Sequence, residues 1–364
     1  MVEQQLKYEE IVRWMKKKID GKELLAGQKI PSENELASIF SVSRQTVRHA
    51  ISVIEDEGLV ERRRGSGTYV RGMKRKDHFD KKTMRVAIVT TYVDEYIFPT
   101  MLKELERKFS KANYTIQIAF THNTVEKERI ILKNFLGRKV IDGIIAEPVK
   151  SGLPNPNLKL YEELEAKGIP IIFLNTFYLQ LPMMHVCMDD KRAGQMATEH
   201  LLQCGHTRIA GIFKSDDGQG HRRYAGYMEA LMERGIKIRE DRITWIDTLD
   251  AKHMGEYAGP ILNRLTNCTA CVCYNDEIAV KLVGICKEAG IKIPEDLSIV
   301  GIDDSDLARL CEIPLTSVRN PIVDLAGITA EKMVRMLSGD TDLENVELEP
   351  SLVMRNSVQI VSSI

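Results

Sequence analysis

The sequence of 364 residues lacks any run of about 18 apolar residues, which a transmembrane helix would need. Its first residues form an amphipathic pattern with acidic side chains, without the apolar core or the small-residue cleavage site of a signal peptide. Its seven cysteines show no spacing of a disulfide framework, which favours a reducing compartment. Together these absences predict a protein of the bacterial cytoplasm with no membrane partner.

Motifs of common enzyme chemistry are missing as well. There is no Ser/His/Asp arrangement, and Gly218-Gln219-Gly220 lacks the strand and helix context of a nucleotide-binding loop. The run Cys268-x-x-Cys271-x-Cys273 suggests a metal site, but it has no neighbouring histidine and no second CxxC pair. The pattern favours a buried strand, in which cysteine acts as a small apolar residue. The sequence therefore predicts no enzyme activity, no cofactor and no metal.

Residues 31–70 have the layout of a winged helix-turn-helix. Ser32 is placed to cap a first helix, and Glu35 completes a capping box. Ser43 is placed to cap a second helix, which ends at Gly58. Apolar residues recur at helical spacing on the two helices: Leu36, Ile39, Phe40, Val47, Ala50, Ile51 and Ile54. Residues 59–63 and 68–70 then read as two short strands around a basic, glycine-rich tip.

The polar face of the second helix suits the major groove of DNA, where arginine can bind guanine and glutamine can bind adenine. The arginines of the hairpin tip add charge for phosphate contact. With this order of elements, residues 8–70 resemble the GntR-type winged helix-turn-helix of bacterial transcription factors. The resemblance implies double-stranded operator DNA as a partner, with Arg44, Arg48 and Gly67 among the contacts. The full predicted contact set is Ser32, Glu33, Asn34, Ser43, Arg44, Gln45, Thr46, Arg48, Arg63, Arg64, Gly65 and Gly67.

The chain divides into three parts. Residues 1–71 form the DNA-binding domain, residues 72–83 a charged linker without periodicity, and residues 84–364 a long body. Within the body, short apolar strands alternate with helices in two similar, successive sets. This alternation predicts an α/β fold with two Rossmann-like halves, each a parallel sheet covered by helices on both faces. Such sheets bind ligands beyond the carboxyl ends of their strands, so a cleft is expected between the halves.

The body resembles the LacI/GalR-type effector-binding domain, which is related to periplasmic sugar-binding proteins. The matching segments include residues 141–145, 197–202, 223–227, 275–279 and 294–304. The resemblance implies a two-lobed, periplasmic-binding-protein-like fold that dimerises and binds a small-molecule sugar effector. We therefore expect residues 84–364 to be an effector-binding and dimerisation domain, and the active species to be a homodimer.

A sugar site needs paired polar side chains for adjacent hydroxyls and an aromatic platform for the ring. Side chains of this kind follow the predicted strands. The predicted effector contacts are Tyr92, Tyr96, Glu147, Asn175, Arg223, Asn275 and Asp303. The first three rest on position and chemistry, and the other four on the resemblance. Asp276 and Asp304 are predicted instead to cap the helix or loop that follows them.

A GntR-type head joined to a LacI-type body is the arrangement of the repressors of L-arabinose operons, a family that this chain resembles. The resemblance implies a transcriptional repressor that leaves its operator when L-arabinose binds in the cleft. Another sugar or a sugar phosphate would suit much the same polar set. A corepressor would use the same architecture, but its binding would strengthen the operator complex instead of releasing it. The sequence leaves open both the identity of the effector and the direction of its effect.

Overall fold

The computed structural model describes residues 2–21, 23–25, 27–56, 59–63, 66–70, 82–92 and 96–361. The chain forms two compact units, Met1–Lys81 and Lys82–Ile364. Most of the predicted linker, residues 72–81, lies outside the described residues, as do Gly58, Arg64 and Gly65. Within the described ranges, no helix combines the length and the apolarity needed to cross a bilayer.

The described residues of the first unit form three helices and a two-stranded hairpin. Helix α1 is Val2–Asp20, α2 is Glu33–Phe40 and α3 is Arg44–Asp56, and strands β1 (Val60–Arg63) and β2 (Gly67–Val70) pair antiparallel. The predicted capping box is present: the Glu35 amide donates to Ser32 Oγ (3.3 Å), and the Ser32 amide donates to the Glu35 carboxylate (2.7 Å). The predicted winged helix-turn-helix is confirmed.

The core of this unit joins all three helices to the hairpin, and its buried residues are Ile11, Met15, Ile30, Leu36, Val47, Ala50, Ile51, Ile54, Val60 and Val70. One expectation is wrong. The pattern places Ile39 on the apolar face of α2, but 57% of this residue is exposed. Phe40, one position later, takes the inward place and packs edge-on against Trp14 of α1.

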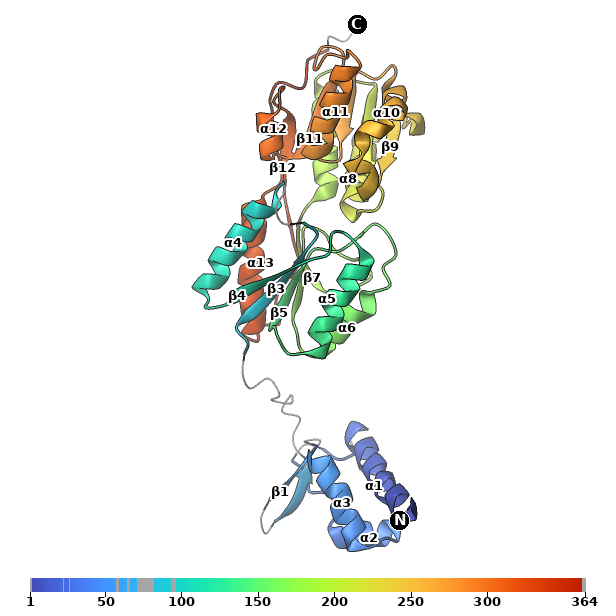
Figure 1. Cartoon of the computed structure of the whole chain (residues 1–364), viewed down its shortest axis with the longest axis vertical. Helices are drawn as coiled ribbons and strands as arrows, with labels where there is room; N and C mark the ends of the chain where they lie inside the picture. The colour runs from blue at the N-terminus through green and yellow to red at the C-terminus, as the bar shows by residue number, and fades with distance from the viewer. Residues whose placement is uncertain are drawn as a thin grey trace. The chain divides into compact units, whose positions relative to one another are not determined.

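The second unit has two lobes, each built on a six-stranded sheet (Figure 1). In the first lobe the strand order is β13-β7-β6-β5-β3-β4, and all neighbours are parallel. The strands are β3 (Arg85–Thr90), β4 (Thr115–Phe120), β5 (Gly143–Ala146), β6 (Ile171–Leu174), β7 (Met184–Met188) and β13 (Val346–Leu348). Helices α4 (Phe98–Lys111) and α13 (Ile322–Leu337) cover one face, and α5 (Val125–Gly137) and α6 (Leu158–Ala166) cover the other (Figure 1).

Alternation along β3 explains this layering. Val86 and Ile88 belong to the cluster that includes side chains of α4 and α13, whereas Ala87 and Val89 belong to the cluster with α5 and α6. Successive side chains of a strand point to opposite faces, so a strand between two helical layers must be apolar throughout. The continuous apolar run of β3 meets that requirement.

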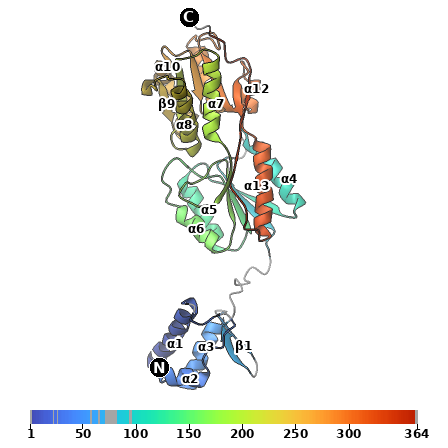
Figure 2. The same cartoon turned by 180° about the vertical axis from the view of Figure 1, so that it is seen from behind.

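The second lobe has the strand order β14-β12-β11-β10-β8-β9, parallel except for the edge strand β14. Its strands are β8 (Ile209–Lys214), β9 (Ile243–Ile246), β10 (Ala270–Cys273), β11 (Ser298–Asp303), β12 (Thr316–Arg319) and β14 (Ser351–Val353). Figure 2 shows α7 (Asp190–Gln203) and α8 (Gly218–Glu233) on one face. The remaining helices are α9 (Thr248–Lys252), α10 (Ala258–Leu265), α11 (Asp276–Glu288), α12 (Asp306–Leu310) and the 3₁₀ turns Glu240–Arg242 and Met254–Tyr257.

The predicted α/β fold with two parallel sheets is confirmed, but the two lobes are not successive segments. The chain passes between them three times: from β7 to α7, from β12 to α13, and from β13 to β14. Helix α13 and strand β13 thus return to the first lobe late in the chain. Local periodicity predicts an element, but it does not say which lobe the element joins.

Candidate functional site

A cavity of about 160 Å³ lies between the lobes, beyond the carboxyl ends of the strands. All seven predicted effector contacts line it, so the structure brings them together. They come from both lobes: Tyr92, Tyr96, Glu147 and Asn175 from the first, and Arg223, Asn275 and Asp303 from the second.

Glu147 is the polar centre of the first-lobe wall. It follows β5, and its Oε2 accepts hydrogen bonds from the Thr90 hydroxyl (3.0 Å), the Thr91 amide (2.9 Å) and the Thr91 hydroxyl (2.6 Å). Burial raises the pKa of the Glu147 carboxyl, and these hydrogen bonds oppose the rise. Asn175, which follows β6, donates its amide to Glu147 Oε1 at 3.4 Å. The wall therefore holds a carboxylate whose position is fixed before any ligand arrives.

Arg223 organises the second-lobe wall. Only 1% of Arg223 is exposed. Its guanidinium donates to Asp190 Oδ1 (2.9 Å), to the Tyr274 carbonyl (2.6 Å) and to Asp303 Oδ1 (3.3 Å). Asp303 ends β11 with a φ of 113° and lines the cavity. Burial raises the pKa of Asp303, and the Arg223 charge opposes that rise. A buried carboxylate held by a guanidinium is a fixed acceptor for a ligand hydroxyl.

The two walls meet through hydrogen bonds that join the lobes. The Tyr96 hydroxyl donates to Asp303 Oδ2 at 2.6 Å. Burial and the Asp303 charge raise the pKa of Tyr96 well above its usual value, so the hydroxyl keeps its proton and remains a donor. Nearby, the Asn123 amide donates to the Thr248 hydroxyl at 2.7 Å. Because these hydrogen bonds connect the two lobes, the cleft is closed in this structure.

Two buried polar atoms that line this region have no hydrogen-bond partner among the described residues: the Tyr92 hydroxyl and Asn175 Oδ1. An unpaired buried polar group is costly, so each is a place where a ligand hydroxyl would be favoured. Asn275 caps α11, because its side-chain oxygen accepts from the Ile278 amide at 3.0 Å. Its amide nitrogen is therefore the group that can donate to a ligand.

Sequence reasoning missed several polar residues that line the cavity: Asn123, Lys150, Lys214, Asp217, Gln219, Thr248, Lys252 and Glu277. Asp217 had a local signal, since it precedes α8 and caps it by accepting from the Gln219 amide. Lys252 had none. It ends a helix of five residues, and its ammonium lies 5.0 Å from the centre of the Tyr92 ring in the other lobe.

The predicted capping roles of Asp276 and Asp304 need correction. The cap of α11 is Asn275, and Asp276 instead accepts from the amide and hydroxyl of Ser305 (2.8 and 2.9 Å). Asp304 binds the guanidinium groups of Arg319 and Arg355. Both aspartates tie loops of the second lobe together.

The predicted DNA-binding residues lie on the first unit. Arg44 and Gln45 are exposed in the first turn of α3, while the Ser43 hydroxyl accepts from the Thr46 amide at 3.2 Å. Glu33 and Arg48 bind each other, with Nη2–Oε2 at 2.9 Å and Nε–Oε1 at 3.2 Å. This pair lowers the pKa of Glu33.

The Glu33–Arg48 pair therefore orients one arginine on the exposed face of α3, which also carries the predicted base-reading residues. Ser32 is engaged in the capping box, and Asn34 is exposed in α2.

The hairpin supplies the rest of the predicted surface. Arg63 pairs with Gly67 across β1 and β2, and Gly67 has a φ of 119°, which favours glycine. A Cβ added at Gly67 would lie 2.5 Å from Lys29 Cε, but that lysine side chain is flexible, so the backbone conformation is the stronger reason for glycine. Arg64 and Gly65 lie outside the described residues.

A DNA-binding head and a two-lobed body with a polar cleft define a ligand-responsive transcription regulator. Comparison with known proteins agrees: residues 7–70 match the gntR family of bacterial regulatory proteins, and residues 198–358 match the periplasmic binding protein-like domain. The transcription regulator CcpA of Lactococcus lactis has the same fold as the body, with a TM-score of 0.68 and 24% identity over 77% of this chain and 100% of its own.

Relatives of nearly full length give the family. The chain is 38% identical over 363 residues to the arabinose metabolism transcriptional repressor of Halalkalibacterium halodurans, covering 96% of each chain. It is 36% identical over 357 residues to the repressor of the same name from Geobacillus stearothermophilus, again over 96% of each. The chain belongs to the family of arabinose metabolism transcriptional repressors.

Proposed function

We propose that the chain is a homodimeric repressor that binds its operator through α3 and the hairpin and releases it when L-arabinose binds in the cleft. The cavity carries the proposal, because it presents fixed acceptors, fixed donors and unpaired polar atoms in a chain whose relatives are named for arabinose metabolism. The protein acts in the bacterial cytoplasm as a regulator rather than an enzyme.

The size and charge of the cavity favour a neutral monosaccharide. Pockets for drug-sized ligands measure about 300–1,000 Å³, and this cavity measures about 160 Å³. Glu147 and Asp303 are acceptors for adjacent hydroxyls, and the Tyr92 ring offers an aromatic surface. Each of these groups binds a polyol without requiring a charge on the ligand.

A sugar phosphate is the second candidate, because Lys150, Lys214 and Lys252 all line the cavity. Two of them already face carboxylates: Lys150 lies 4.0 Å from Asp216, and Lys214 lies 3.7 Å from Asp217. These partners offset the positive charge that a phosphate would need. The neutral sugar is therefore favoured.

The mechanism follows from linkage. Residues of both lobes bind the same ligand, so the sugar favours the closed arrangement over an open one. A lobe rearrangement in a dimer changes how well its two heads fit the two half-sites of an operator. The sugar can shift the equilibrium only by the difference in its affinity for the two states.

The test uses the full chain with a panel of pentoses, hexoses and their phosphates. A ligand present at about a hundred times its dissociation constant should add roughly 2.7 kcal/mol to the free energy of unfolding, seen as a higher melting temperature. L-arabinose should produce this shift and should dissociate the operator complex in a gel-shift assay. Strengthening of that complex by arabinose would overturn the release mechanism, and the absence of a melting shift with every sugar would overturn the assignment of the cleft.

A further inference from the structure

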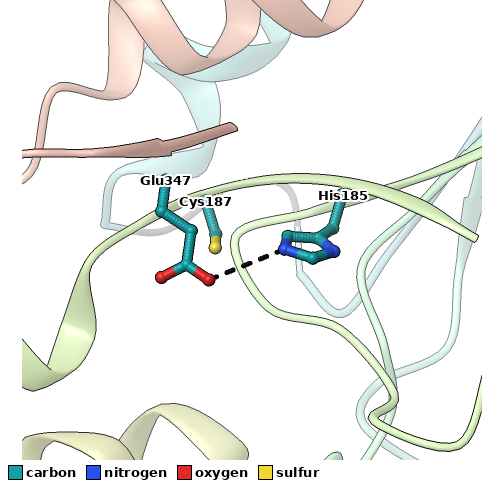
Figure 3. A group of neighbouring side chains, drawn as sticks. All are labelled: His185, Cys187 and Glu347. Carbon is teal, nitrogen blue, oxygen red and sulfur yellow. Dashed lines mark ion pairs between the residues drawn. The ribbon is translucent and has the colours of Figure 1, made fainter. Parts of the chain in front are cut away.

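A second cluster of side chains lies outside the cleft, on two neighbouring strands of the first lobe. His185 and Cys187 are two residues apart on β7, so they lie on the same face of the sheet. Glu347 on β13 stands opposite Cys187 in the parallel register. One ligand atom from each residue lies within 4.8 Å of the other two, and the three side chains converge in Figure 3.

The three groups are the ligand types that zinc prefers: imidazole nitrogen, thiolate sulfur and carboxylate oxygen. The spacing also suits one ion. Two ligands each about 2.0–2.1 Å from a tetrahedral ion are about 3.3–3.4 Å apart, and His185 Nε2 lies 3.6 Å from Glu347 Oε1. A small closure of the cluster would bring all three atoms to one metal.

The surroundings hold two of the ligands in orientation. Glu347 presents Oε1 to His185, while its Oε2 is bound by the guanidinium of Arg222 from α8. The His185 ring hydrogen-bonds the backbone of Met183 and stacks on Phe177 with centroids 3.9 Å apart. Metal-binding histidines and carboxylates in proteins are held by outer partners of this kind.

Charge gives an independent argument. Arg222 faces two carboxylates, Glu347 and, at 4.0 Å, Asp189. With Cys187 as a neutral thiol, this group carries a net negative charge. A divalent cation bound with Cys187 as thiolate would make it neutral, since the proton of the thiol leaves as the metal binds.

We propose that His185, Cys187 and Glu347 form a binding site for one Zn²⁺ ion, with Arg222 positioning the carboxylate. The proposal concerns strands β7 and β13 and is independent of the identity of the sugar. Three protein ligands leave the fourth position of a tetrahedral ion for water.

The test titrates the full chain, freed of metal by a chelator, with Zn²⁺ against a chromophoric competitor, and separately with Co²⁺. We expect one equivalent of Zn²⁺ per chain and a thiolate-to-cobalt absorption band in the near ultraviolet. Cys187→Ser should abolish the band and weaken Zn²⁺ binding at least tenfold. Glu347→Gln should also weaken binding at least tenfold, and circular dichroism of each variant checks that it is folded.

Cys204→Ser is the matched control. Cys204 also lies beside an imidazole, with its sulfur 4.0 Å from His200 Nε2, but it does not belong to the three-ligand group. This variant should keep the cobalt band and the Zn²⁺ affinity. Failure of the full chain to bind Zn²⁺, or binding that Cys187→Ser and Glu347→Gln leave unchanged, would overturn the proposal.

Discussion

Removing the Tyr96 hydroxyl tests whether closure of the cleft controls the repressor. Tyr96→Phe deletes the 2.6 Å hydrogen bond from the first lobe to Asp303 in the second. Asp303 Oδ1 keeps Arg223 and Asn320 as donors, whereas Oδ2 loses the donor that Tyr96 supplies. The hydroxyl also donates to the Ile302 carbonyl and accepts from the Asp276 amide, each at 3.3 Å, so the substitution removes this bond together with two longer contacts to the second lobe.

The size of the effect can be estimated from that bond. A hydrogen bond to a charged group contributes about 1.5–3 kcal/mol. If it forms only in the closed state, its loss lowers the closed population, and the apparent affinity for sugar falls by about 10- to 150-fold. We expect isothermal titration calorimetry to show this loss and the gel shift to need correspondingly more sugar to release operator.

Tyr161→Phe is the matched control. Its hydroxyl donates to the buried Glu128 at 2.8 Å, but both residues belong to the first lobe. This variant should lose stability and keep its affinity for sugar. If Tyr96→Phe and Tyr161→Phe both bind sugar within about threefold of the parent chain, the hydrogen bond between the lobes does not govern closure, and the reasoning is refuted.

Three further predictions concern other parts of the molecule. Arg44→Ala should weaken operator binding by roughly 1–3 kcal/mol but binding to random DNA much less, and equal losses in a competition gel shift would count against base reading. Burial, and secondarily the Asp303 charge, raise the pKa of Asp276 to about 7 in the folded protein, above its unfolded value near 4. The folded protein therefore binds more protons between these two values. Its free energy of unfolding should fall by up to about 4 kcal/mol as the pH rises from about 4 to 7. In urea titrations at pH 5 and 8, Asp276→Asn should lack this component, and identical pH slopes for both proteins would contradict it. Arg222→Gln should weaken Zn²⁺ binding by about 10- to 100-fold in the competitor assay, whereas tighter binding would mean that the guanidinium repels the metal.

The local elements were predictable where a single chemical pattern decides them. Strand β3, Arg85–Thr90, is an example, because a continuous apolar run is the pattern of a strand that is buried on both faces. Helix α8 begins at Gly218 because Asp217 caps it there. The capping box of α2 was visible in the sequence for the same reason, since it joins residues three positions apart.

Long-range relations were not predictable from those patterns. Glu347 reaches Cys187 only because β13 returns to the edge of the first sheet, so sequence reasoning found no metal site there. The resemblance placed Asn275 in the cleft, but its capping role depends on the backbone at the start of α11. Lys252 reaches the Tyr92 ring across two lobes, and no spacing along the chain encodes that approach.

The three passages between the lobes also constrain how the protein is made. The head ends at Val70 in the described structure and contains its own core, so it has all its parts early in synthesis. The first lobe, in contrast, lacks an edge strand until residues 346–348 have left the ribosome. A chain truncated before β13 would therefore carry a complete operator-binding head without a complete sensor.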